Sequence, residues 1–225
     1  MPDKDENFYA GHRARLRAKF LDNQLADYEK LELLLMYAIP RRDVRPLARA
    51  LVNKFGGVYQ VLSAPFDALV SVKGIGHNTA VFIKLVQQMM TINYHGQLKE
   101  TPIFHDETIL HNYCRIIVAG KTVEELHILY LDNNLKLIAD EVHSTGTVDS
   151  SAVYPREIAK RALELNARSV VMVHNHPTSN NSFSRDDIEI TTLVQSVLSG
   201  LNIELYDHFV VSGDIFYSAR QMHLI

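Results

Sequence analysis

Apolar residues follow a helical spacing in the first hundred residues of the chain. Residues 31–38 form a nearly continuous apolar segment that stops before Pro40, and residues 47–55 form another that is followed by two glycines. A further helix is predicted over residues 81–91, and the basic segment at residues 12–20 adds one more. The chain is therefore expected to begin with an all-helical region.

The remainder of the chain alternates between strand-like and helix-like segments. Two apolar runs separated by Asn133 and Asn134 predict a β-hairpin. The predicted strands are residues 126–131, 137–143, 169–174, 203–211 and 215–218, and the predicted helices are residues 106–120, 155–166 and 184–199. This order predicts a mixed α+β chain, with a helical domain over residues 1–100 and an α/β domain with a mixed sheet over residues 103–225. The polar stretch at residues 94–102 is the expected boundary.

Composition favours a globular enzyme inside the cell. The chain has 225 residues, of which 47% are hydrophobic, enough for one large domain or two small ones. Cys114 is the single cysteine, which excludes an intramolecular disulfide and cysteine-based zinc motifs. The apolar runs are too short to span a membrane and the first residues do not resemble a signal peptide, so cytoplasm is the expected location.

Charge is divided unevenly between the two predicted domains. The net charge is −3 overall. Residues 1–100 hold 14 Lys and Arg against 10 Asp and Glu, a balance of +4, whereas residues 101–225 hold 9 against 16, a balance of −7. Such an asymmetry indicates two domains with different partners.

A group of metal-binding residue types follows the predicted central strand. His174 and His176 stand at its end, Ser184 comes eight residues after His176, and Asp187 three residues later. Side chains at i and i+2 of a strand point to the same face, so both imidazoles are expected to project together. A helix beginning at Ser184 would bring Asp187 back to them. Two imidazoles and one carboxylate, with a fourth position open, are typical of a catalytic zinc, so this spacing predicts a metallohydrolase.

The same residues also have simpler interpretations. Two histidines at this spacing are often hydrogen-bonded or partly exposed without any metal. Ser184 and Asp187 have the spacing of a capping box, in which hydroxyl and carboxylate bind free N–H groups at a helix start. The serine can cap the helix and still face a metal. The complete spacing is more specific than either pair, which favours the zinc site.

This spacing resembles the JAMM (MPN+) metalloprotease motif, and the residues around it resemble the bacterial RadC family. The stretches that carry the resemblance are GTV, VYPREI, RALELNA, HNHP and DH at residues 146–148, 153–158, 161–167, 174–177 and 207–208. The first hundred residues are also similar to the family's N-terminal region. The resemblance implies an MPN-like fold for the second domain, within a superfamily whose members include isopeptidases. RadC proteins are associated with DNA repair by name.

The resemblance also implies a role for each motif residue. Two histidines and one aspartate would bind zinc and a serine would stabilise the oxyanion: His174, His176, Asp187 and Ser184. A glutamate at the start of the domain's first strand would act on the water at the zinc. Counting back from Asp132 places this glutamate at Glu124, with Glu125 as the alternative. Glu141 fits less well, because it begins the following strand.

A second motif lies in the helical domain. Residues 72–80 (VKGIGHNTA) resemble a helix-hairpin-helix, in which a Gly-x-Gly turn joins two helices and Ile75 enters the core. Gly74 and Gly76, with Lys73 beside them, would let a phosphate approach the main chain, so contact with the DNA backbone is expected without sequence specificity. A hairpin that only packs, or that binds protein, is the simpler alternative. Further phosphate contacts could come from Arg13, Arg15 and Arg17, which otherwise belong to a solvated basic helix.

Three classes of function are consistent with this sequence. The favoured one is a zinc-dependent hydrolase of peptide or isopeptide bonds, with a peptide or protein substrate and a domain that contacts DNA. The second is a nuclease, but two-metal phosphodiester chemistry needs several bridging carboxylates and this motif supplies one. The third is a DNA-associated scaffold with an inactive metal site, against which the complete motif argues. Loops at residues 144–153 and 178–183 are expected to set the substrate, whose identity the sequence does not give.

Overall fold

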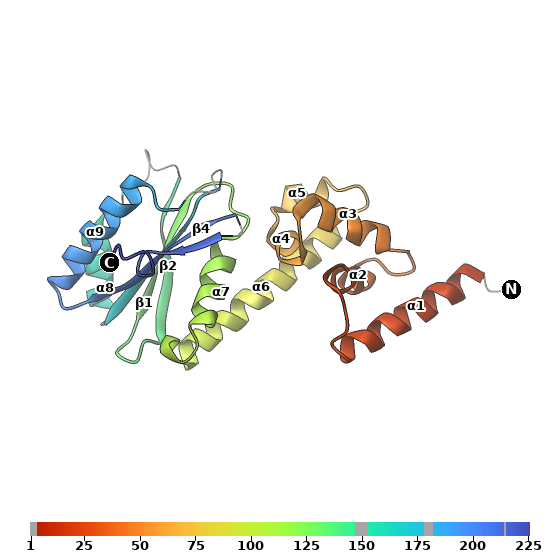
Figure 1. The fold of residues 1–225 in the computed structure, drawn as a ribbon, viewed down its shortest axis with the longest axis horizontal. Helices are drawn as coiled ribbons and strands as arrows, with labels where there is room; N and C mark the ends of the chain where they lie inside the picture. The colour runs from red at the N-terminus through yellow and green to blue at the C-terminus, as the bar shows by residue number, and fades with distance from the viewer. Residues whose placement is uncertain (1–3, 147–152, 178–181, 214) are drawn as a thin grey trace. The chain divides into compact units, whose positions relative to one another are not determined.

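The structure is a computed structural model that describes residues 4–146, 153–177, 182–213 and 215–225 (Figure 1). The chain forms two compact units, Met1–Met89 and Met90–Ile225. Most of the two loops expected to set the substrate, at residues 144–153 and 178–183, lies outside the described residues.

The first compact unit is helical, as predicted. Its helices are α1 (Lys4–Leu21), α2 (Asp27–Ala38), α3 (Arg45–Phe55), α4 (Val58–Ser63), α5 (Phe66–Val70) and the first part of α6 (His77–Glu100). The short helix α4 was missed, because six residues are too few to show a helical period. Leucines at positions 31, 35 and 51 are almost fully buried and hold the helices around one apolar core.

The turn between α5 and α6 has the form expected of a helical hairpin. Ile75 is 4% exposed and belongs to the apolar core, as predicted. Gly74 has a φ of +100°, a backbone conformation that residues with a Cβ adopt only under strain. The side chain of Leu47 would also lie 3.4 Å from a Cβ at this position. Glycine is therefore required at residue 74 by the backbone itself.

Helix α6 continues through most of the polar stretch that was expected to be the domain boundary. It ends at Glu100, so residues 94–100 are helical, and the two compact units divide at Met89, inside this helix. Gln97, Lys99 and Glu100 are good helix formers despite their polarity. Leu98 is 1% exposed in the core of the second unit, and burial of this side chain stabilises the final turns. The polar residues before Glu100 therefore belong to this helix.

The second compact unit is built on a five-stranded mixed sheet, which confirms the predicted fold class. The strands are β1 (Glu125–Leu131), β2 (Leu137–Thr145), β3 (Ser169–Asn175), β4 (Glu204–Ser212) and β5 (Ile215–Ser218). Their order is β2-β1-β3-β4-β5, with β3 and β4 parallel and the other neighbours antiparallel. All seven residues of β3 are buried, as expected for a central strand.

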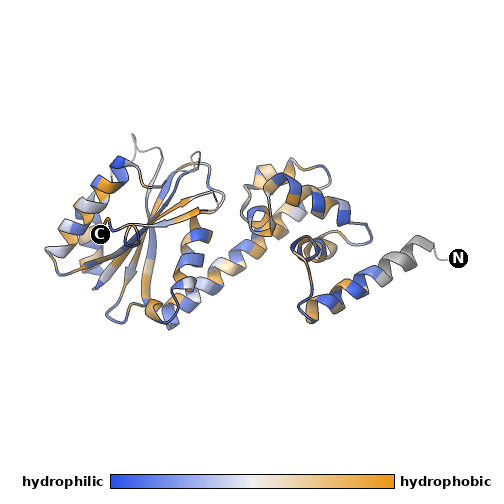
Figure 2. Ribbon diagram, in the orientation of Figure 1, coloured by the Kyte–Doolittle hydropathy of each residue, from blue (hydrophilic) through white to orange (hydrophobic). Residues whose placement is uncertain are grey.

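Helices cover both faces of this sheet (Figure 1). One face packs against α7 (Glu107–Val118), which follows the short helix η1 (Ile103–His105), and the other against α8 (Pro155–Glu164) and α9 (Arg185–Ser199). Alternation along β1 divides its side chains between two cores: Leu129 and Leu131 face α7, whereas Ile128 and Tyr130 face α8 and α9. These helices carry both polar and apolar segments, as helices with one face on a sheet should (Figure 2).

None of the helices in the described part of the chain is both long and apolar enough to cross a membrane.

Candidate metal centre

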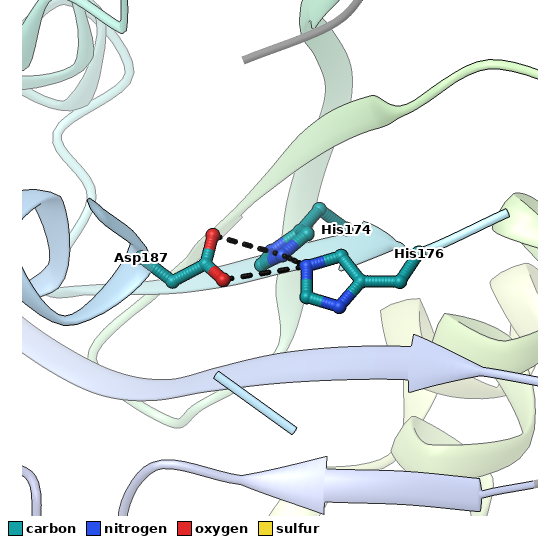
Figure 3. A group of neighbouring side chains, drawn as sticks. All are labelled: His174, His176 and Asp187. Carbon is teal, nitrogen blue, oxygen red and sulfur yellow. Dashed lines mark hydrogen bonds and ion pairs between the residues drawn. The ribbon is translucent and has the colours of Figure 1, made fainter. Parts of the chain in front are cut away.

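Three side chains predicted to bind metal meet at one end of the sheet (Figure 3). His174 is the second-last residue of β3, and His176 directly follows the end of this strand. Asp187 lies in the first turn of α9. All three are buried, and their potential ligand atoms lie within 4.8 Å of one another. The structure therefore brings together the residues that sequence spacing selected, although ten residues separate His176 from Asp187 along the chain.

The spacing of their atoms suits a single metal ion. His174 Nε2 lies 3.0 Å from His176 Nε2 and 3.1 Å from Asp187 Oδ1, and His176 Nε2 lies 3.3 Å from Asp187 Oδ2. Ligands about 2.0–2.1 Å from a tetrahedral zinc are about 3.3 Å apart. Two imidazoles and a carboxylate are also ligand types that zinc accepts. Donor chemistry and geometry thus both fit a zinc ion.

Asp187 remains ionised in this environment. Burial by itself would raise the pKa of the Asp187 carboxyl, but hydrogen bonds from the imidazoles of His174 and His176 and from the Ser184 hydroxyl outweigh it. Together they hold that pKa far below its ordinary value. An ionised carboxylate beside two imidazoles is a suitable group of ligands for a cation.

Ser184 forms the capping box that the sequence suggested. Its hydroxyl donates to Asp187 Oδ2 at 2.6 Å and accepts from the Asp187 amide at 3.1 Å, while the Ser184 amide donates to Asp187 Oδ2. The serine is exposed and stands as N-cap of α9. Its hydroxyl proton therefore points to the Asp187 carboxylate in this structure. Ser184 therefore caps α9 and also lies beside the metal-binding group, as the sequence allowed.

A chain of buried hydrogen bonds behind His174 was not foreseen. His208, on β4, places Nε2 2.9 Å from His174 Nδ1, and its Nδ1 lies 2.6 Å from the hydroxyl of Thr191 on α9. The Thr191 hydroxyl donates its proton to the carbonyl oxygen of Asp187. The neighbouring Asp207 has other partners, because its carboxylate accepts from Ser218 and from two backbone amides.

This series of hydrogen bonds assigns a proton to Nδ1 of His174. Because the one proton of the Thr191 hydroxyl is donated to Asp187, Thr191 must accept from Nδ1–H of His208. Burial lowers the pKa of the His208 imidazole well below its ordinary value, so this ring is neutral and its Nε2 is an acceptor. His174 consequently donates from Nδ1, and its Nε2 faces His176 and Asp187. Nε2 is thereby prepared to bind a metal.

A cavity of about 200 Å³ opens beside this group. Its wall is largely apolar, with Leu126, Val153, Met172 and Ile190, and it includes His174 and Asp187. The backbone or side chains of Glu124 and Glu125 also border it. A mostly apolar cavity with a few convergent polar groups is the usual form of a binding site.

The strand register separates the two glutamates. Leu126 lies opposite His174 in the β1–β3 pair, so these two side chains share a face of the sheet. Glu124, two residues before Leu126, falls on that same face, whereas Glu125 falls on the other. The Glu125 carboxylate is accordingly paired with Lys121 and lies 3.5 Å from His127. Within the described chain, the Glu124 carboxylate makes no hydrogen bond or ion pair, and it is free to meet a substrate.

Glu141, the third glutamate considered, lies elsewhere on the sheet. Its carboxylate forms a two-pronged ion pair with Arg161 of α8, at distances of 2.6 and 2.9 Å. Glu141 does not line the cavity beside His174. Its carboxylate has a structural partner, and Glu124 is better placed for chemistry.

The residues expected to contact DNA belong to the first compact unit. Lys73, Gly74 and Gly76 are all exposed in the turn before α6. A Cβ at Gly76 would meet no atom within 4 Å, so the main chain there is open to a ligand. This arrangement is compatible with phosphate contact, which stays a prediction.

Comparisons with known proteins agree with this architecture. Residues 104–224 match the RadC-like JAB domain, which covers the second compact unit from η1 to the last described residues. Over its whole length the chain is also similar to the UPF0758 protein FN0909 of Fusobacterium nucleatum subsp. nucleatum. The two are 37% identical over 235 residues, an alignment that covers 100% of each protein. By its domain and by this full-length similarity, the chain belongs to the RadC family of proteins with a RadC-like JAB domain.

Proposed function

We propose that this protein is a zinc-dependent hydrolase that cleaves peptide or isopeptide bonds. The observation that carries the proposal is the convergence of His174, His176 and Asp187 within 4.8 Å beside a cavity that Glu124 borders. Amide hydrolysis needs a polarised carbonyl, an activated water and a proton donor for the leaving amine. The three clustered side chains would hold a metal for the first two requirements, and Glu124 would carry the proton for the third.

Zinc, when bound by the two histidines and Asp187, would polarise the carbonyl and lower the pKa of water. Glu124 would take a proton from the attacking water and deliver it to the departing amine nitrogen. Its position on the same sheet face as His174 puts the carboxylate on the cavity side, where a substrate amide would lie. The apolar wall of the cavity would exclude bulk water, which strengthens the electrostatic interactions inside.

Ser184 would act later in the reaction. As the amide carbon becomes tetrahedral, negative charge develops on the former carbonyl oxygen. The Ser184 hydroxyl, which donates to Asp187 Oδ2 in this structure, would turn its proton toward that oxygen. Its amide keeps a hydrogen bond to Asp187 at 2.7 Å, so the helix cap would survive this rotation.

The test is hydrolysis by the zinc-loaded protein of fluorescein-labelled casein and of a mixed peptide library read by mass spectrometry. Cleavage that requires both zinc and Glu124 supports the proposal. Cleavage of a DNA duplex but not of peptides would favour the nuclease alternative. No cleavage of either, with zinc bound at one ion per chain, would favour a scaffold with a structural metal.

The hydrogen bonds behind His174 are expected to strengthen zinc binding. Replacing Thr191 with valine keeps the size of the side chain but removes the acceptor for Nδ1–H of His208. His208 can then turn its proton toward His174, which opposes the tautomer that a metal needs. We expect Thr191→Val to weaken zinc affinity by about 10- to 100-fold, measured by competition with a chromophoric chelator.

Thr192→Val is the matched control. Thr192 makes the same kind of hydrogen bond to a backbone carbonyl, that of Ile188, but is exposed and has no contact with His208. Its replacement should leave zinc affinity unchanged within about twofold. Equal losses in both variants would mean that the helix, and not the link to His208, determines affinity.

We propose further that the helical hairpin contacts the DNA backbone. Gly74 holds the turn open with a φ of +100°, and the first amides of α6 follow directly, where a helix attracts phosphate. Replacing Lys73 with alanine should weaken binding to a fluorescein-labelled duplex and reduce the slope of log affinity against log salt by about one. Lys30→Ala, on α2, should leave the slope unchanged. An unchanged slope in Lys73→Ala would contradict this contact.

A further inference from the structure

The asparagine between the two histidines makes two hydrogen bonds across the sheet. Asn175 is 4% exposed, and its side chain reaches the main chain at the start of β1. Its Oδ1 accepts from the amide of Glu125 at 2.9 Å, and its Nδ2 donates to the carbonyl oxygen of Val123 at 3.0 Å. These two main-chain groups flank a single residue, Glu124.

The side-chain amide of Asn175 extends the hydrogen bonding between β1 and β3 beyond the last backbone pair. Backbone pairing between β1 and β3 extends as far as Leu126 opposite His174. One step beyond, the carboxamide of Asn175 offers the same donor and acceptor that a peptide group would offer. On the opposite edge, the amide of Gly146 donates to the carbonyl of Glu124 at 2.9 Å. The main chain around Glu124 is thus held from both neighbouring strands.

We propose that Asn175 is a positioning residue that sets Glu124 relative to the metal-binding histidines. Asn175 is covalently next to His174 and His176, and its side chain points to the opposite face from theirs. One short segment therefore presents the ligands on one face and, through Asn175, holds the residues on either side of Glu124, just before β1. A shift of the histidines would move Glu124 with them. This inference rests on the proposed role of Glu124 as proton carrier.

Asparagine is well suited to this position among residues of its size. Aspartate would keep an acceptor for the Glu125 amide but would set a second oxygen against the Val123 carbonyl. Leucine has similar bulk and neither polar group. Alanine would leave both main-chain groups without their partner in a segment where Glu125 is only partly exposed.

The first experiment measures hydrogen exchange and needs no substrate. In Asn175→Ala, the Glu125 amide should exchange about tenfold faster or more, because its acceptor is gone. Zinc content should stay at the wild-type value, because the three proposed ligands are intact. Asn133→Ala, in the exposed turn at the other end of β1, is the matched control and should change neither quantity. Unchanged exchange in Asn175→Ala overturns the proposal.

The second experiment asks whether Asn175 acts through Glu124. Turnover of labelled casein should fall by about 10- to 100-fold in Asn175→Ala, since misplacing a catalytic group by about 1 Å has an effect of this size. In the Glu124→Gln background the same change should cost less than about twofold more, because the group being positioned is already inactive. Full additivity of the two losses overturns the proposal.

The isosteric Asn175→Asp variant guards against a folding defect. It retains the volume and the acceptor for Glu125, so it should fold and bind zinc even where the alanine variant does not, and its turnover should fall at least about tenfold. Wild-type turnover in Asn175→Asp overturns the proposal. If the wild-type protein cleaves no peptide, the proposed hydrolase function fails, while hydrogen exchange still decides whether Asn175 holds this segment.

Discussion

Protein with His176 replaced by alanine is expected to lose its bound zinc. His176 supplies one of two imidazoles, and its Nε2 lies 3.0 Å from His174 Nε2 and 3.3 Å from Asp187 Oδ2. Two remaining ligands cannot complete a catalytic site, which takes about three protein ligands and one open position. We expect zinc content to fall from about one ion per chain to a small fraction of that value. Atomic emission on protein purified without chelator is the measurement.

His105→Ala provides the control for this experiment. His105 is an exposed histidine in the same compact unit, and its ring contacts Phe104 and not the three ligands. This variant should keep zinc at the wild-type level. Both variants should retain the circular dichroism of the folded protein, because His176 is part of no apolar core cluster.

Two results would contradict the zinc site. Zinc retained in folded His176→Ala would place the ion elsewhere in the protein. A folded wild-type protein that takes up no zinc would reduce Ser184 and Asp187 to a helix cap. In the second case, the helical hairpin at residues 72–80 would become the better guide to function.

Replacement of Glu124 with glutamine is expected to separate zinc binding from catalysis. Glutamine keeps the size of the side chain but cannot accept a proton, so turnover should fall by about 10²- to 10⁴-fold. Zinc affinity should be unchanged, because Glu124 is not among the three clustered ligands. Turnover of labelled casein and zinc content are measured on the same preparation.

Glu125→Gln is the neighbouring control. The Glu125 carboxylate pairs with Lys121, and the side chain belongs to the opposite sheet face from His174. Loss of such a partly exposed ion pair costs only about 0–1 kcal/mol of stability. Turnover should therefore stay close to the wild-type value, because this carboxylate lies on the face away from His174. If Glu125→Gln were inactive and Glu124→Gln active, Glu125 and not Glu124 would be the proton carrier.

Local sequence predicted most of this protein's architecture. The five strands, the helical first region, and the helices that became α7, α8 and α9 all follow from hydrophobic period and from breakers such as Pro155 and Gly200. These signals involve residues within a few positions of one another, so they can be read along the chain. The convergence of His174, His176 and Asp187 was predictable for the same reason, because one strand, one loop and one helix start connect them.

The segment at residues 94–102 shows where local reasoning failed. Its polarity predicted the end of a helix near residue 91 and a domain boundary, yet α6 extends to Glu100 because Leu98 is buried against elements that follow it in the sequence. The benefit of burying one leucine depends on which surface arrives to cover it. No local pattern contains that information.

Sequence by itself determined the elements, the mixed fold and the set of residues able to bind metal. Only the tertiary structure put Glu124 and not Glu125 on the face of His174. It also placed His208 and Thr191 behind the His174 ring and joined the side chain of Asn175 to the amide of Glu125 at the start of β1. Each of these relations depends on register between strands and helices far apart in the chain. A shift of one residue would send every side chain of a strand to the other face. Pairing between distant segments sets that register. The order of residues within a single strand is the same in either register, so it does not reveal which face each side chain will occupy.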